Sequence, residues 1–194
     1  YKNYSFFKLM VKDNIDSKGF RENVGIIIGN SKCQLLLAGR VGKRGWQFPQ
    51  GGIHNGETSE DAMYRELYEE VGLQQTDVEI LGVTSEWLKY NLPNQYIRQD
   101  TKPLCIGQKQ KWYMLKLISD DKSISLDISV LPEFDRWKWV PFWKPVAKVI
   151  FFKRLVYFSA LSELGPALFN KGIPKIPNWW PTNWQEKCDR ESDL

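Results

Sequence analysis

Runs of β-branched and aliphatic residues alternate with turn residues early in the chain. The run at 24–29 is short and rich in isoleucine, which is typical of a buried strand. A second apolar run at 34–38 follows a turn at Asn30 and Ser31, so the two runs predict a hairpin. Further strand-like runs lie at 78–87, 111–118 and 137–142.

The pattern becomes helical between residues 58 and 71, where apolar residues recur three and four positions apart. Thr58 is a candidate N-cap with Asp61 in capping-box register, and Gly72 is the expected stop. A second helix is predicted over 150–164. Strands on both sides of a helix, with another helix closing the domain, predict an α/β fold of the mixed-sandwich type.

The chain divides into three parts by composition. Residues 1–19 are mixed in character and form a predicted N-terminal extension, and regular patterning occupies 20–168. Residues 169–194 form a tail rich in proline and tryptophan, which we expect either to dock through its tryptophans or to stay loose. The length of 194 residues fits one domain with extensions.

Composition excludes several kinds of chemistry. His54 is the only histidine, so a site with several histidine ligands is impossible and a catalytic triad would depend on that one residue. The three cysteines are far apart, which predicts neither a zinc site nor a disulfide framework and favours a cytoplasmic protein. We expect His54 itself to be an exposed loop residue without a chemical role.

Three carboxylates share one face of the first predicted helix. Glu66, Glu69 and Glu70 fall within an arc of roughly 100° on a helix with 3.6 residues per turn. Like charges at this spacing repel, so a cation is expected to compensate them, and carboxylate oxygens suit Mg²⁺ or Mn²⁺. Taken alone, such a helix face is more often ordinary solvated surface.

The residues around these glutamates carry a longer pattern. Five residues separate the first glycine from the first glutamate, seven more precede an Arg-Glu-Leu triplet, and two further glutamates and a Gly-Leu pair complete the series. This pattern reproduces in full the signature of the Nudix hydrolases, at Gly51, Glu57, Arg65, Glu66, Leu67, Glu69, Glu70, Gly72 and Leu73. The resemblance implies the Nudix fold, an α/β/α sandwich with a mixed sheet and a loop-helix-loop that presents carboxylates to a diphosphate.

The resemblance is closer to one group within that superfamily. Segments resembling the bacterial RNA pyrophosphohydrolases are GFRENVGIII, WQFPQGGI, AMYRELYEEVGL, IGQKQKWY, PEFDRWKW and FFKRLVY. Members of that group remove phosphates from triphosphorylated or diphosphorylated 5′ ends of RNA and leave a monophosphate, which promotes mRNA decay. Two alternatives stay open: a hydrolase of diadenosine tetraphosphate or a similar dinucleotide, and a Nudix module that binds nucleotides or RNA without turnover.

The resemblance also implies roles for individual residues. Metal ligands and catalytic residues would be Glu66, Glu69, Glu70 and Glu133, with Glu70 or Glu133 assisting the attacking water. Gly51, Glu57, Arg65 and Gly72 would have structural roles in the signature. Substrate-binding positions would be Arg21 and Arg40, which face the 5′ phosphates and first nucleotides, and Gln108, Ile150, Phe152 and Lys153, which hold the next base.

The same resemblance implies the cofactor and the partners. Mg²⁺ or Mn²⁺ is expected, with more than one ion, and the expected partner is 5′-phosphorylated single-stranded RNA. No DNA or membrane partner is expected, the protein would be a cytoplasmic monomer, and a protein activator is left open.

The charge distribution agrees with a metal site that meets a polyanion. The chain has a formal net charge of +4, which by itself is too small to indicate a nucleic-acid partner. Residues 57–70 have a net charge of −5, so the rest of the chain carries +9, and residues 136–154 contain six basic side chains and no acidic one. An acidic patch within a basic surrounding is the arrangement that a metal-bound polyphosphate requires.

Overall fold

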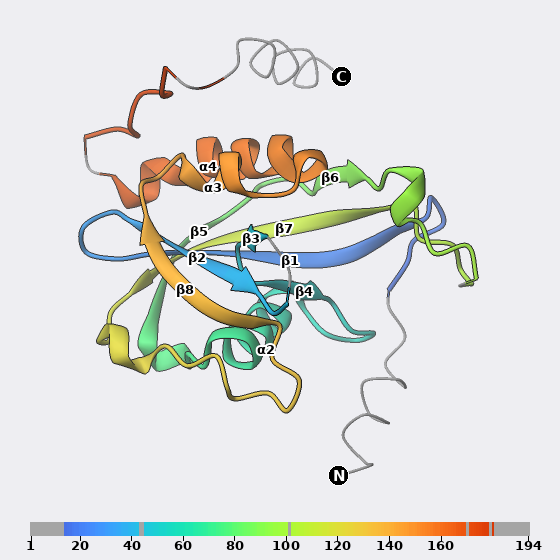
Figure 1. Cartoon of the computed structure of the whole chain (residues 1–194), viewed down its shortest axis with the longest axis horizontal. Coiled ribbons are helices and arrows are strands. Elements are labelled where there is room, and N and C mark those ends of the chain that lie inside the picture. Colours follow the sequence, from blue (N-terminus) through green and yellow to red (C-terminus); the bar gives the residue numbers. More distant parts are fainter. Residues whose placement is uncertain (1–13, 43–44, 101, 170, 179, 181–194) are drawn as a thin grey trace.

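A mixed β-sheet forms the centre of the molecule. The computed structural model describes residues 14–42, 45–100, 102–169, 171–178 and 180. Within these residues, eight strands belong to one sheet (Figure 1): β1 Phe20–Gly29, β2 Leu35–Arg40, β3 Trp46–Gln47, β4 Gln50–Gly52, β5 Val78–Val83, β6 Leu88–Asn91, β7 Gly107–Leu117 and β8 Phe134–Val140.

Helices cover both faces of this sheet. Helix α2 (Ser59–Val71) lies on one side, and α3 (Lys144–Lys148) and α4 (Arg154–Leu168) lie on the other, as Figure 1 shows. This arrangement confirms the predicted α/β/α sandwich. Among the described residues, no helix is both long enough and apolar enough to cross a bilayer.

The long strands β1 and β7 pair in parallel and organise the rest. Their register runs from Phe20 opposite Gly107 to Gly29 opposite Lys116. Antiparallel pairs then add β4 to β1, and β5 and β6 to β7, while β2 carries both β3 and β8. Residues of β1 alternate between two cores, because successive side chains of a strand point to opposite faces. Ile26 and Ile28 pack toward α2, and Ile27 packs toward α4.

Several local predictions are confirmed. The hairpin closes where Gly29 pairs with Leu35. Helix α2 is capped by Thr58, whose hydroxyl oxygen accepts a hydrogen bond from the Asp61 backbone N–H at 3.1 Å. It ends at Gly72, which has a φ of 73°, a left-handed conformation that glycine adopts at little cost.

Other predicted boundaries are wrong. The second helix was expected over 150–164, but residues 151–153 form a 3₁₀ turn and α4 begins at Arg154. It continues through Pro166 to Leu168. The predicted strand at 78–87 ends at Val83, β7 begins four residues before its expected start, and β8 begins three residues early. The short strands β3, β4 and β6 were not predicted, since two to four residues carry too little pattern.

Both extensions are attached to the domain where they are described. Ile15 pairs with Arg21 at the start of β1, and residues 1–13 lie outside the described residues. On the other side, the Trp180 ring is buried against Trp143 and Phe158, with ring centroids 5.7 and 5.2 Å away. The Trp143 indole N–H donates to the Pro174 carbonyl at 2.7 Å. The tail therefore docks through tryptophan as far as residue 180, and residues 181–194 lie outside the described residues.

The substitution Trp180→Ala tests this docking. Removing a buried tryptophan leaves a cavity, and we expect the free energy of unfolding to fall by about 3 kcal/mol in a denaturant titration. Val130→Ala is the control, because Val130 is 73% exposed and its loss should change stability by less than about 0.5 kcal/mol. Equal stability of the two variants would show that the tail does not pack on the domain in solution.

Candidate active site

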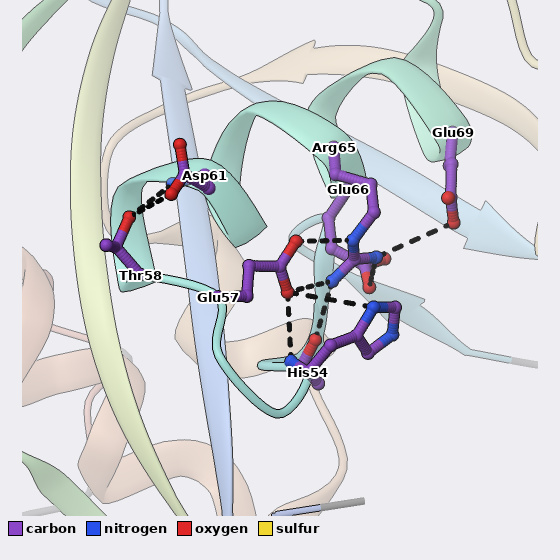
Figure 2. Close-up of polar contacts among 8 residues, drawn as sticks. His54, Glu57, Thr58, Asp61, Arg65, Glu66 and Glu69 are labelled. Carbon is purple, nitrogen blue, oxygen red and sulfur yellow. Dashed lines mark hydrogen bonds and ion pairs between the residues drawn. The ribbon is translucent and has the colours of Figure 1, made fainter. Parts of the chain in front are cut away.

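Arg65 joins the loop before α2 to the helix itself (Figure 2). Its Nε and Nη2 donate to the two carboxylate oxygens of Glu57, at 2.8 and 2.9 Å, and Nη2 also donates to the Gly52 carbonyl at 2.7 Å. Its Nη1 lies 2.6 Å from Glu66 Oε1 and 3.8 Å from Glu69 Oε2. Burial alone would lower the pKa of Arg65, but hydrogen bonds and charge interactions with Glu57 and Glu66 together outweigh it and raise the pKa. The guanidinium is therefore a permanent brace between loop and helix.

The loop itself is closed by Glu57 and His54. The Glu57 carboxylate accepts a hydrogen bond from the His54 backbone N–H at 2.9 Å, and the His54 ring nitrogen Nδ1 lies 3.8 Å from the same oxygen. Burial raises the pKa of Glu57, but the hydrogen bonds from Arg65 and the His54 backbone, together with the charge of Arg65, outweigh it, so the net shift is downward. The expectation of an exposed His54 is wrong in part, since its side chain is 37% exposed and contacts Glu57.

Gly51 allows the close approach of β4 to α2. A methyl group on Gly51 would lie 1.8 Å from the carboxyl carbon of Glu66, far inside van der Waals contact. The Glu66 side chain would therefore have to leave its position. The glycine of the signature is thus explained by space for a carboxylate. Helix α2 can then place the Glu66 side chain directly against β4, the strand that leads into the loop.

Glu70 is the most strongly perturbed carboxyl group of the site. Its side chain is buried, and Oε2 accepts a hydrogen bond from the Gln50 backbone N–H at 2.8 Å. Burial raises its pKa well above the ordinary value, and the neighbouring carboxylates of Glu133 and Glu66 raise it further. The buried Glu70 carboxyl therefore holds its proton to higher pH than an exposed glutamate does.

Glu133 reaches the same place from the other side of the site. It lies just before β8, its side chain is 41% exposed, and the Gln47 side-chain amide donates to Oε1 at 3.4 Å. Arg40 Nη2 is 3.6 Å from the same oxygen. The structure thus brings Glu66, Glu70 and Glu133 together, whereas Glu69 lies at the margin with a side chain that is 46% exposed.

The donor set fits a divalent metal ion. In the arrangement seen, no three acidic side chains of the described residues surround one point at ligand distance. Glu66 is engaged by Arg65, and Glu70 by Gln50. However, burial first, and then the nearby carboxylates of Glu133 and Glu66, disfavour the charged form of Glu70. A hard cation would relieve this, and oxygen donors are what such a cation prefers.

Of the predicted substrate-binding cations, Arg40 and Lys153 lie near the carboxylates of this cluster. Arg21 Nη2 lies so close to Gly52 that a Cβ there would be 2.4 Å away. Within the described part of the chain, Arg40 Nε is buried without a hydrogen-bond partner. The Lys153 ammonium donates to the Gln50 side-chain oxygen at 2.9 Å. Burial lowers the pKa of Lys153 to about 8, and nearby Arg40 lowers it too. Lys153, which the resemblance assigns to a base, therefore lies on the carboxylate side of the site together with Arg40.

The predicted base-binding residues are only partly together. The Tyr90 hydroxyl donates to the Gln108 side-chain oxygen, and the Phe152 ring packs against Tyr90 with centroids 5.8 Å apart. The Tyr96 ring also contacts Phe152, with centroids 5.1 Å apart. Ile150 is 39% exposed, two residues before Phe152. An aromatic wall with an amide at its end is suited to stacking and edge contacts with a base.

Several residues of the site had no signal in the helical pattern. Gln47 and Gln50 come from strands of two and three residues, and only the folded sheet places them beside the glutamates. Tyr90, from β6, and Tyr157, from α4, contact other residues of the site rather than the glutamates. Gln47 and Gln50 belong to a Trp-Gln-Phe-Pro-Gln run that precedes the two glycines. This run by itself does not predict that its glutamines contact carboxylates.

Comparison with known proteins places this site in a family. A model of the NUDIX domain matches residues 19–157, which include the whole carboxylate cluster. The chain belongs to the Nudix family. This Nudix chain is also 55% identical over 163 residues to a protein of Alkalilimnicola ehrlichii named RNA pyrophosphohydrolase, covering 84% of the chain and 90% of that relative. It is 56% identical over 175 residues to a protein of the same name from Cronobacter sakazakii, covering 89% and 98%.

Solved structures agree on the fold. A dihydroneopterin triphosphate pyrophosphohydrolase from E. coli is 19% identical with a TM-score of 0.57, covering 71% of this Nudix chain and 92% of its own. An Ap4A hydrolase from C. elegans in a binary complex is 19% identical with a TM-score of 0.51, covering 72% and 96%. At this identity the likeness shows the fold alone. The chain is a Nudix hydrolase, a family that generally uses divalent metal ions.

The raised pKa of Glu70 predicts that stability of the metal-free protein depends on pH. The unfolded chain loses this proton near the ordinary glutamate pKa, whereas the folded protein holds it to higher pH. The folded state therefore binds more protons, and stability falls as pH rises from the unfolded pKa through the folded one. In EDTA, we expect Glu70→Gln to be more stable than wild type at pH 8 by at least about 1 kcal/mol.

Thermal unfolding measured between pH 5 and pH 9 checks this expectation. Glu69→Gln is the matched control from the same helix turn, because its half-exposed carboxylate has access to water. A Glu70→Gln curve parallel to wild type would contradict the assignment of the buried proton to Glu70.

Proposed function

We propose that this protein is a metal-dependent RNA 5′-pyrophosphohydrolase. It would remove phosphates from triphosphorylated or diphosphorylated 5′ ends of RNA and leave a 5′-monophosphate, which opens the message to decay. The observation that carries the proposal is the buried Glu70 facing Glu133 and Glu66, with Arg40 and Lys153 beside them. Relatives named RNA pyrophosphohydrolase, at about 55% identity over most of the chain, support the choice of RNA.

The proposed metal site consists of Glu66, Glu69, Glu70 and Glu133. Mg²⁺ or Mn²⁺ would be held by these carboxylates, and we propose more than one ion because four acidic groups and a polyphosphate supply more oxygens than one ion uses. A bound ion supplies charge neutralisation of the phosphate oxygens and lowers the pKa of water. Glu69 would have to turn inward from its half-exposed position.

The protein's own groups would orient the reaction. A carboxylate at Glu133 or Glu70 accepts the proton of the attacking water, and we propose Glu133 for this role, because its carboxyl is partly exposed to solvent whereas Glu70 is enclosed. The Gln47 amide holds the Glu133 carboxyl. The guanidinium groups of Arg21 and Arg40 bind the outer phosphates, and Arg65 keeps the helix fixed to its loop.

The nucleotide end of the substrate would lie against the aromatic wall. The half-buried Phe152 ring, which contacts Tyr90 and Tyr96 at tilted angles, would stack on the second base, and the Gln108 amide is bonded to Tyr90 nearby. Ile150 would border the same base. A dinucleotide substrate would need the carboxylates and arginines but would gain less from this wall, so RNA is preferred to the alternative of a diadenosine tetraphosphate hydrolase.

The proposal also includes the domain boundaries, the partner, the oligomeric state and the cellular location. Residues 20–168 would form the catalytic domain, with residues 169–194 as an appended tail that docks at Trp180. Single-stranded RNA is the proposed partner, the enzyme would act as a monomer, and messenger RNA as a substrate places it in the cytoplasm.

Parallel assays on two substrates test this function. With Mg²⁺ or Mn²⁺ present, we expect kcat/KM for a 5′-triphosphorylated RNA oligonucleotide to exceed that for diadenosine tetraphosphate by about tenfold or more. EDTA should abolish hydrolysis of both, and added metal should restore it. Greater efficiency on the dinucleotide would refute the RNA assignment and favour the alternative.

A pair of variants separates catalysis from simple binding. Glu70→Gln keeps the shape of the side chain but removes the ligand charge, and we expect kcat to fall by about 100-fold or more. Glu60→Gln lies on the exposed first turn of α2 and should leave kcat unchanged. Unchanged turnover in Glu70→Gln would eliminate the carboxylate mechanism, and no turnover in wild type would favour a binding module.

A further inference from the structure

The segment 46–50, which runs from β3 to the first residue of β4, contacts two carboxylates of the site. Residues 46–50 carry Gln47, whose amide donates to Glu133, and Gln50, whose backbone N–H donates to Glu70. The two glutamates come from different parts of the chain, one after β7 and one from α2. Their relative position therefore depends on how firmly this five-residue segment is held.

The sheet binds the segment at both ends and at Pro49, but it does not bind the Phe48 N–H. Trp46 and Gln47 pair with β2, and Gln50 pairs with β1. Between them, the Pro49 carbonyl accepts a hydrogen bond from Ile26 at 2.9 Å, and the Phe48 backbone N–H points away from the sheet ladder. A buried N–H without an acceptor costs free energy, so this group needs a partner from another element.

That partner is Tyr157 of α4. Its hydroxyl oxygen accepts the hydrogen bond from the Phe48 N–H at 3.0 Å, and both residues are fully buried. The Tyr157 ring stacks on the Phe48 ring with centroids 4.9 Å apart, and Trp112 contacts both rings edge-on. Burial also raises the pKa of Tyr157, so the hydroxyl keeps its proton and stays a neutral acceptor.

The 3₁₀ turn that leads into α4 makes a second contact with the same segment. Its last residue, Lys153, donates to the Gln50 side chain at 2.9 Å. Helix α4 and the turn before it thus hold the segment at two points, while its glutamines contact Glu133 and Glu70.

We propose that Tyr157 is a positioning residue, which fixes the 46–50 segment and thereby sets the distance between the metal-binding carboxylates of Glu70 and Glu133. Tyr157 itself touches neither carboxylate and would act only through Phe48 and its neighbouring glutamines. The inference rests on the proposed function for the identity of these carboxylates as metal ligands. Partners of this kind, outside the ligands themselves, commonly change metal affinity or activity by about 10-fold to 100-fold when removed.

The test is Tyr157→Phe, which keeps the stacked ring and removes only the acceptor. The matched control is Tyr113→Phe, because the Tyr113 hydroxyl is also buried and bonded, 2.7 Å from Ser59 Oγ, at the start of α2 away from the segment. The deciding measurement is a calorimetric titration of each full-length variant with Mn²⁺ at a temperature well below unfolding. We expect the Mn²⁺ dissociation constant to rise about tenfold in Tyr157→Phe and to stay within about twofold in Tyr113→Phe.

Steady-state kinetics on the phosphoanhydride substrate that wild type hydrolyses give a second readout. We expect kcat of Tyr157→Phe to fall about tenfold at saturating metal with KM nearly unchanged, because the aromatic wall is untouched. If the Mn²⁺ dissociation constant of Tyr157→Phe equals that of wild type, the inference is overturned and Tyr157 is only a core residue. If wild type fails to hydrolyse RNA, the proposed function fails, and the titration still decides the role of Tyr157.

Discussion

The burial of one carboxyl group governs the organisation of this site. Glu70 is buried beside two other carboxylates and accepts a hydrogen bond from one backbone N–H. Such a group costs folding free energy unless it is protonated or paired with a cation. Glu66 is buried as well, and the neighbouring elements keep the three carboxylates near one another despite their repulsion.

Two sets of contacts, one ionic and one neutral, hold the carboxylates near one another. On the helix side, Arg65 is an ionic brace, which holds Glu57, Glu66 and the Gly52 carbonyl with one guanidinium. On the sheet side, the 46–50 segment is a neutral brace made of amide groups. A neutral brace is well suited there, because a permanent cation between Glu70 and Glu133 would compete with the metal ion for the same oxygens.

Sequence reasoning reached the helix side of the site but not the sheet side. The spacing of Glu57, Arg65 and the helix glutamates lies within one local element, whose geometry follows from 3.6 residues per turn. Thr58 and Gly72 could be identified as caps for the same reason. The contacts of Gln47 and Gln50 depend on strands of two and three residues. Such strands are stabilised by tertiary pairing, so no local sequence pattern predicts these contacts.

The substrate-binding residues show the same limit. Family resemblance gave the identities of Arg21, Arg40, Gln108 and Phe152, but charge and pattern alone would have left them as surface or core positions. In the structure, Lys153 is buried and donates a hydrogen bond to Gln50. It therefore lies near the carboxylates, in addition to its predicted contact with a base. It could not be anticipated because lysine is rarely buried, and its enclosure depends on the 3₁₀ turn before α4.

Gly51 has a consequence for how this enzyme can vary. Because the Glu66 carboxyl occupies the space where any side chain of residue 51 would begin, the volume available there is smaller than a methyl group. Even alanine therefore collides at its first carbon and would displace the Glu66 carboxyl from its place beside β4. Any substitution at residue 51 should thus disturb the position of this proposed metal ligand, whatever the size of the new side chain.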